Sequence, residues 1–402
     1  MNKYLILFLM AVLSVNSAVA ASALFTATPA NKQSLKDSSG STIQQLRQQG
    51  VALTLDRKQL QRLKPNARLQ LPAGGKHYDA VIKRLIKHAN GSKTWIATLV
   101  NDKGANKEQS KEQRPVILTV SDKSFFIRLV TPTGVFVMSG QGNQGTMVTE
   151  RVLRQSIDTD ESDVLDPRLT ESFKKKIALG AKSALSITAP FITAPSITNS
   201  SIPDLPLPSP PRLDHSFIKQ AAAQTNNAST VQIDVLVLYT AGVVALYNSD
   251  HQTRINHLFA VTNQIYIDSG VLIQVNPVVT ELTEYSDTIR SEPALQSMTN
   301  QTDPAFINIH NRRFEVGADT VMLMRPSISG DLCGAAWGNG DSGLLGDYRN
   351  YMYSTVSINC DDTVTAHELG HNMGLAHSRT QLETGIVSHG RWDTVFKTNL
   401  AP

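Results

Sequence analysis

The pattern of apolar and polar residues changes its period along the chain. Between residues 50 and 150, short β-prone runs alternate with turns rich in Gly, Asn, Asp and Lys, which predicts a compact β-rich domain. The predicted strands lie at residues 51–55, 68–71, 95–99, 116–120 and 134–138. The charged stretch 151–186 that follows favours a helix. This front region contains no catalytic signature.

Beyond residue 228 the pattern alternates between strand and helix. Apolar positions between Ile255 and Tyr266 recur at helical spacing, and residues 305–314 form a second helical candidate. Three apolar β-prone runs lie at residues 231–239, 271–278 and 320–324. This order predicts an α/β (α+β) domain with a mixed twisted sheet and helices packed on it.

A proline-rich stretch separates the two regions. Residues 186–227 contain a repeated Ile-Thr-Ala-Pro unit and a run of closely spaced prolines. Proline at this density is incompatible with helix and central sheet, so the stretch is predicted to be an extended linker. The predicted domains are therefore residues 21–185 and 228–402.

The first 20 residues have the layout of an export signal. Lys3 precedes an apolar run, and small residues around Ala18 and Ala20 offer a cleavage site. The alternative is a membrane anchor, but the run is well short of the ~20 residues that span a bilayer. The mature protein is predicted to be secreted (extracellular, or periplasmic in transit) with no membrane anchor after signal cleavage.

Charge is distributed unevenly between the two halves. Residues 1–216 hold 28 basic and 16 acidic residues, whereas residues 217–402 hold 10 and 18. The lysines of the front half are scattered and are not interleaved with aromatic residues, so the pattern does not indicate a nucleic-acid partner. Two oppositely charged domains that attract each other at low salt are the simpler interpretation.

The chain has two cysteines, Cys333 and Cys360. An even pair in an exported protein favours one disulfide bond. Two buried free thiols are the alternative, and Cys360 as a metal ligand is a third interpretation.

A histidine-rich segment carries the candidate chemistry. His367 and His371 are four residues apart, so on a helix they project from one face and could bind one ion. Gly374 could adopt a positive φ, end the helix and turn the chain so that His377 reaches the same ion. Glu368 would lie beside the metal, where its carboxylate acts as general base toward a water molecule.

Three neutral imidazoles suit Zn²⁺ and leave a fourth position open, which is typical of a catalytic site. A single histidine is more often an ordinary structural residue. Five specified residues in fixed register are rare by chance, and this favours the metal site.

The run from His367 to His377 resembles the metzincin zinc metallopeptidases. The residues Leu369 to Leu375, together with the Cys333–Ala336 segment, are similar to the reprolysin-like branch, and the chain resembles bacterial peptidyl-Asp metalloendopeptidases. The resemblance implies a metzincin fold, zinc, protein or peptide substrates, and a removable pro-domain at residues 21–185.

The sequence departs from the family pattern at two positions. Leu400 stands where the family has a methionine beneath the metal, and the lower part of the domain that follows in the family is short here. Ser378 stands where an Asp commonly follows the third histidine. Leu for Met is nearly volume-conserving. No cysteine precedes Cys333, so inhibition by a pro-domain cysteine is not available, and we expect the basic pro-domain itself to act as the inhibitor.

The sequence thus predicts a zinc endopeptidase made as a precursor. The alternative is a zinc-binding metzincin module that is catalytically weak or inactive and serves in binding. Glu368 favours the enzyme, because a pure binding module has no need for that carboxylate.

Overall fold

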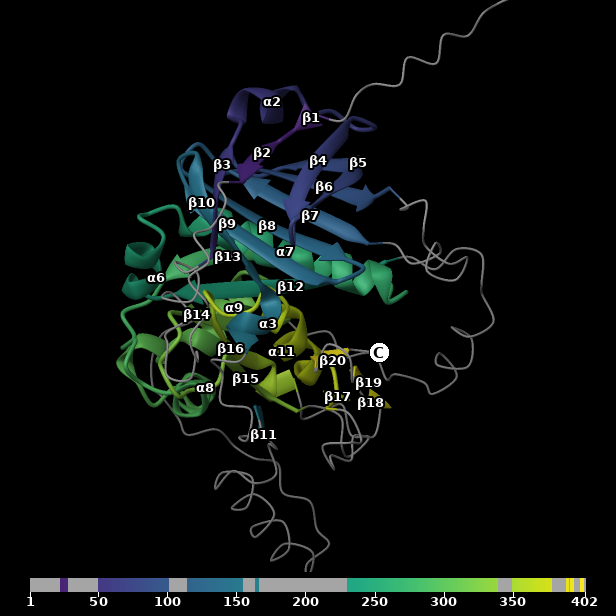
Figure 1. Cartoon of the computed structure of the whole chain (residues 1–402). Coiled ribbons are helices and arrows are strands. Elements are labelled where there is room, and N and C mark those ends of the chain that lie inside the picture. Colours follow the sequence, from purple (N-terminus) through teal and green to yellow (C-terminus); the bar gives the residue numbers. More distant parts are fainter. Residues whose placement is uncertain are drawn as a thin grey trace, which may run out of the picture. The chain divides into compact units, whose positions relative to one another are not determined.

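The computed structural model forms two compact units (Figure 1). The first comprises residues 1–156 together with 250–260, and the second comprises 157–249 and 261–402. Within them, the structure describes residues 22–27, 50–100, 114–154, 163–165, 230–338, 349–377, 388–389, 391–393 and 398–400. The predicted signal segment 1–20 and linker 186–227 lie outside the described residues. No helix in the described ranges is long and apolar enough to cross a membrane.

The first unit is a ten-stranded sheet in the order β1-β4-β5-β6-β7-β8-β9-β10-β3-β2. Its strands are β1 (Ser22–Ala23), β2 (Phe25–Ala27), β3 (Val51–Leu55), β4 (Arg68–Ala73), β5 (Lys76–Lys87), β6 (Lys93–Leu99), β7 (Pro115–Val120), β8 (Ser124–Thr131), β9 (Gly134–Gln141) and β10 (Gln144–Thr149). Two short helices, α2 (Arg57–Arg62) and α3 (Glu150–Arg154), accompany them. The predicted β-rich front region is therefore present, and it contains more strands than the sequence analysis placed.

The N-terminal segment closes this sheet on itself. Strand β1 pairs in parallel with β4, and β2 pairs antiparallel with β3. Between them, the Leu24 amide donates to the Gln70 carbonyl at 3.3 Å, and the Leu24 carbonyl accepts from the Asp56 amide at 3.0 Å. One short segment thus joins both edges, and the sheet becomes a barrel.

Alternate side chains fill the interior of the barrel. Leu69 and Leu71 on β4, and Phe125 and Ile127 on β8, are at most 1% exposed and belong to one apolar cluster. The period of two places these residues on the inner face of their strands. The interior is consequently a packed core of side chains.

The second unit is built on a six-stranded sheet in the order β11-β15-β16-β14-β12-β13. Its strands are β11 (Val164–Leu165), β12 (Val231–Tyr239), β13 (Ile273–Leu282), β14 (Thr320–Arg325), β15 (Gly334–Trp337) and β16 (Tyr353–Ser357). The strands β13, β12, β14 and β16 are parallel, β15 runs antiparallel to β16, and β11 pairs in parallel with β15. The predicted mixed α/β sheet is confirmed.

Helices connect these strands. They are α6 (Ala241–Leu246), α7 (His251–Asp268), α8 (Ser291–Asn300), η3 (Pro304–Phe306), α9 (Ile309–Glu315), η4 (Arg349–Tyr351) and α11 (Val364–Asn372). Two short pairs of strands follow, β17 (Leu375–Ala376) with β18 (Ser388–His389), and β19 (Arg391–Asp393) with β20 (Thr398–Leu400).

Two predicted elements differ from the structure. The helix expected at residues 305–314 is divided into η3 and α9, because Asp303 caps a single turn that begins at Pro304 and the chain restarts after Asn308. The prediction of one helix over residues 151–186 is also wrong for the residues of that stretch that the structure describes. Helix α3 ends at Arg154, and residues 164–165 form strand β11. The other residues of that stretch lie outside the described ranges.

Candidate metal centre

Helix α11 carries the first two predicted ligands and is fixed at both ends. Before its first turn, the Asp361 carboxylate accepts hydrogen bonds from the Thr363 amide at 2.8 Å and hydroxyl at 3.0 Å. The Tyr266 hydroxyl donates to the Ala366 carbonyl at 3.1 Å from helix α7. These bonds set the position of the histidines within the second unit.

Asn372 fixes the last turn of α11 to the sheet. Its side-chain amide donates to the Trp337 carbonyl at 3.1 Å and to the Tyr353 carbonyl at 3.0 Å. Because Trp337 lies on β15 and Tyr353 on β16, one buried side chain ties the helix to two strands.

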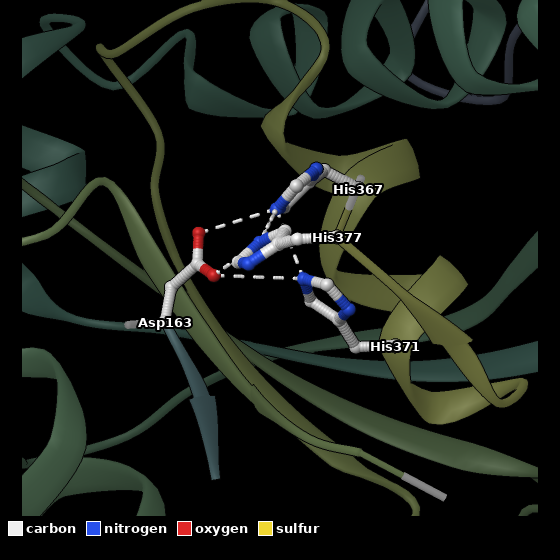
Figure 2. Close-up of side chains that lie close together, drawn as sticks. All are labelled: Asp163, His367, His371 and His377. Carbon is white, nitrogen blue, oxygen red and sulfur yellow. Dashed lines mark hydrogen bonds and ion pairs between the residues drawn. The ribbon is translucent and has the colours of Figure 1, made fainter. Parts of the chain in front are cut away.

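Gly374 turns the chain back after the helix, as the sequence predicted. Its φ is +91°, a conformation that glycine adopts without the cost of a Cβ clash. The chain then forms β17, and His377 follows that strand on the same side as His367 and His371. Figure 2 shows the three rings around one point.

The Nε2 atoms of the three rings converge. Those of His367 and His371 are 2.9 Å apart, and those of His367 and His377 are 3.2 Å apart. The other ring nitrogen of His371, Nδ1, lies 2.8 Å from the Leu375 carbonyl and must donate to it. Neutral His371 therefore presents an unprotonated Nε2 to the centre.

This arrangement fits a tetrahedral divalent metal ion. Nitrogen ligands at about 2.0–2.1 Å from zinc lie about 3.3 Å from one another in that geometry, close to the separations observed here. A cation between the rings also explains why several ring nitrogens point at one another. His367, His371 and His377 are the residues that would hold it.

A carboxylate that the sequence analysis did not identify completes the group. Asp163 Oδ1 lies 2.7 Å from His377 Nε2 and 3.6 Å from His371 Nε2, and Oδ2 lies 3.2 Å from His367 Nε2 (Figure 2). The ligand atoms of all four residues lie within 4.8 Å of one another. The centre thus has three imidazoles and one carboxylate.

Burial and mutual interactions shift the protonation of this group. Burial alone would raise the pKa of Asp163, but the charge of His367 and the hydrogen bonds of all three histidines hold it well below its ordinary value. Burial, followed by His367, lowers the pKa of His371. An anionic carboxylate and a neutral imidazole are the forms that bind metal ions.

Glu368 follows His367 on α11 and is almost completely buried. Its side chain packs against the start of β15, where a Cβ added to Gly334 would come within 2.2 Å of Glu368 Oε1. Glu368 Oε2 has no hydrogen-bond partner among the described residues. Burial, with a further contribution from Asp163, raises the pKa of Glu368 well above its ordinary value. This carboxyl group is therefore poised to hold a proton.

The disulfide predicted between Cys333 and Cys360 is formed, with the two Cα atoms 5.9 Å apart. Cys333 immediately precedes β15, and Cys360 lies four residues before the start of α11. The bond joins the strand beside Glu368 to the segment that leads into α11, the helix that carries His367 and His371.

The family comparison agrees with this geometry. Residues 229–390 match a reprolysin-type model described as metallo-peptidase family M12. These residues therefore resemble a metallopeptidase domain of family M12. Residues 20–154 match the model of the BamI lipocalin-like domain, which coincides with the closed barrel of the first unit.

The curated relatives align with less than half of this chain. A peptidyl-Asp metalloendopeptidase of Pseudomonas aeruginosa is 31% identical over 178 residues, covering 41% of this chain and 28% of the relative. One from Stenotrophomonas maltophilia is 28% identical over 157 residues, covering 39% and 36%. The structure of metalloproteinase-II from Bacteroides fragilis is 14% identical, covers 80% of this chain and 85% of that chain, and has a TM-score of 0.41. The chain spans about a third of the length of these two curated relatives.

Sequence reasoning missed two residues of this candidate centre, Asn372 and Asp163. Asn372 directly follows His371 in the run that carries the histidines, which was the available signal. Asp163 is 204 residues from His367 in the chain and is one of several acidic residues between 158 and 166, so no local signal distinguishes it.

Proposed function

We propose that this protein is a secreted zinc endopeptidase made as a precursor. The observation that carries the proposal is the convergence of three imidazole Nε2 atoms beside a buried glutamate. Zinc, when bound, acts as a Lewis acid that polarises a peptide carbonyl and makes a water molecule more acidic.

The protein's own residues supply the remaining steps. His367, His371 and His377 would hold the ion; the side chains of His371 and His377 are buried, and that of His367 is partly exposed. The Glu368 carboxylate would take a proton from the attacking water and return it to the leaving amine, as a general base and then a general acid. The raised pKa of Glu368 favours the second of these roles.

Peptides and proteins are the proposed substrates. The two curated relatives are named peptidyl-Asp metalloendopeptidases, so Asp-containing peptides are the first candidates to assay. The β-rich pro-domain, residues 21–185, is the proposed inhibitor of the precursor.

The decisive experiment compares the purified protein with Glu368→Gln after removal of the pro-domain from both and zinc loading. We expect about one zinc per chain in both proteins, and hydrolysis of casein only by the protein with Glu368. Zinc binding without hydrolysis in either protein, after removal of the pro-domain, would support the rival function, an inactive zinc-binding module. Equal hydrolysis by both would exclude Glu368 as the base.

Secretion and processing have their own test. Mass spectrometry of the protein recovered from the culture medium would show a chain that lacks residues 1–20, and a processed form that lacks the pro-domain. A full-length chain retained in the cytoplasm would contradict this part of the proposal.

A further inference from the structure

We infer that a buried chain of hydrogen bonds holds the first half of helix α7 against the barrel at neutral pH, and that it breaks when both of its imidazoles are protonated. This His–Thr chain consists of two imidazoles and two hydroxyls, those of His88, Thr94, Thr119 and His257. Residues 250–260 belong to the first unit, although they lie within the range 229–390 that matches the peptidase model. The inference does not depend on the metal site.

Three hydrogen bonds connect the four side chains. His88 Nε2 lies 2.7 Å from the Thr94 hydroxyl, which lies 2.8 Å from the Thr119 hydroxyl. The Thr119 hydroxyl in turn lies 3.1 Å from His257 Nδ1. Thr94 is on β6, Thr119 is on β7, and both are fully buried, as is His257 on α7. The chain therefore crosses two strands of the barrel, and its two hydroxyls have no contact with solvent.

Neutral polar groups fix the same helix beside the His–Thr chain. The Asn256 side-chain amide donates to Asn90 Oδ1 and to the Ser92 hydroxyl, at 3.0 Å in each case. The Asn90 amide donates to the Thr253 hydroxyl at 3.2 Å. None of these groups changes its protonation near neutrality. Any response of this contact to mild acid must therefore come from ionisable side chains.

The number of protons in the His–Thr chain is fixed by its geometry. Three links need three protons, and the two threonine hydroxyls supply two of them. One imidazole must therefore donate into the chain, and the other must present an unprotonated nitrogen. Neither threonine hydroxyl has a further hydrogen-bond partner among the described residues. A fourth proton has no acceptor there.

Two imidazolium rings would bring that fourth proton. Each would donate into the chain, and one buried donor would be left without an acceptor, which is costly. One imidazolium with one neutral ring still satisfies every link. Burial also lowers the pKa of His88. The unfolded chain then takes up the proton more readily than the folded one, so the contact is at full strength above about pH 6.5 and weakens as the pH falls below it.

The charges around His257 do not compensate a second proton. Arg254 lies three residues earlier on α7, with its guanidinium carbon 5.4 Å from the centroid of the Phe126 ring. The Phe126 ring is 6.0 Å from that of His257, so the nearby charge is positive and opposes protonation. The Asp250 carboxylate accepts hydrogen bonds from two serine hydroxyls of the barrel, Ser121 and Ser124.

Other ionisable side chains lie on the same elements. They are Lys87, Lys93, His251 and the ion pair of Arg128 with Glu150. His251 is a competing source of pH sensitivity, because burial lowers its pKa as well, with an opposing contribution from Asp250. A test must therefore separate His251 from the His–Thr chain.

An acid-sensitive contact gives the barrel a condition for release that is separate from cleavage of the chain. A cut in the linker 186–227 leaves every hydrogen bond of the His–Thr chain intact. The cut protein is therefore expected to keep its barrel at neutral pH and to lose it in mild acid.

The first test follows the titration of His257 by NMR in the full-length protein labelled with ¹³C-histidine. His88→Gln keeps a polar side chain in the chain but takes up no second proton, so it should raise the pKa of His257 by at least about one unit. In a Thr119→Val background, which removes a link but keeps the side-chain shape, the same replacement should have no effect. Thr94→Val interrupts the chain at its other hydroxyl and serves as the second background.

Direct repulsion between the rings would persist in both valine backgrounds, because it needs no hydroxyl. An equal shift with and without the threonine would therefore overturn the His–Thr chain, as would the absence of any shift in the parent background. Circular dichroism establishes that each variant is folded.

The second test measures release of the barrel from a full-length protein cut at a protease site placed in the linker. Size-exclusion chromatography at about pH 7.5 and about pH 5 lies on either side of the ordinary histidine titration. In His88→Gln/His257→Asn, neutral amides replace the ring nitrogens of the chain. At the lower pH, its barrel should bind at least about fivefold more tightly than that of the parent, the effect of one buried hydrogen bond.

His251→Gln is the matched control and should release its barrel in acid as the parent does. Chelator in every sample makes the state of the metal-site histidines the same in all proteins. A double variant that releases its barrel as readily as the parent would overturn the inference, and so would a His251→Gln protein that keeps its barrel in acid. Neither result bears on the zinc peptidase proposal.

Discussion

Gly334 and Glu368 are in direct apposition: a Cβ on Gly334 would lie 2.2 Å from Glu368 Oε1 and 2.6 Å from Cδ. The φ of Gly334 is not positive, so its backbone does not itself require glycine. The glycine is required by the space that the Glu368 side chain occupies. The first residue of β15 therefore determines where the carboxylate beside the metal site can lie.

Replacing Gly334 with Ala should displace Glu368 and destabilise the second unit by about 1–3 kcal/mol through overpacking. The same substitution in a Glu368→Ala background should cost much less, because the clashing atoms are gone. A thermal-unfolding double-mutant cycle measures this coupling without relying on activity. Equal destabilisation in both backgrounds would mean that Gly334 does not act through Glu368.

The Glu368→Gln variant is expected to keep its zinc and lose activity by about 10²–10⁴-fold, the range for removal of a general base. The amide has the same size as the carboxylate and accepts no proton. Zinc content is measured by atomic absorption and activity with a fluorogenic peptide. Glu284→Gln is the control at an exposed site. A variant that retains more than a tenth of the parental activity would argue for another base.

Removal of the metal should lower both activity and stability. Three histidines from α11 and the segment after it converge on one point, so an ion would join His377 to the two histidines of the helix. A ligand at 100 times its Kd stabilises the folded state by about 2.7 kcal/mol. Chelator treatment should therefore lower Tm, and Zn²⁺ but not Mg²⁺ should restore it. An unchanged Tm in the metal-depleted protein would contradict a metal at this position.

The disulfide should matter more for stability than for metal binding. Cys333 and Cys360 are separated by 27 positions, and a loop of this size corresponds to about 3 kcal/mol in the chain-entropy model. The double variant Cys333→Ala/Cys360→Ala should have a lower Tm, yet its folded fraction should still bind one zinc, because neither cysteine belongs to the ligand group. Loss of zinc from a folded double variant would show that the bond also positions the histidines.

The parts of the site that the sequence predicted depend on local geometry. His367 and His371 share a face because a helix repeats every 3.6 residues, and Gly374 allows the turn that returns His377. Such relations extend over about ten residues, so they can be predicted without knowledge of the rest of the fold. Strand β12 was predicted in the same way, from a local run that ends in five consecutive apolar residues, 235–239.

The parts that the sequence did not reveal depend on distant pairings. Asp163 reaches the histidines only because β11 pairs with β15, and no property of either strand specifies that register. Arg128 on strand β8 of the barrel is buried and forms an ion pair with Glu150. A charged residue therefore does not mark an exposed position there. Strand β5 was also missed, because its twelve residues include five with basic or imidazole side chains.

The closure of the barrel by residues 22–27 has a consequence for proteolysis and aggregation. A closed sheet has no exposed edge, whereas an open one offers unpaired amides and carbonyls to neighbouring chains. Trimming the amino terminus by this one segment would expose the edges of β3 and β4 together and uncover the space filled by Leu24 and Phe25. Chains shortened in this way should self-associate through strand pairing while those that begin at residue 21 stay dispersed.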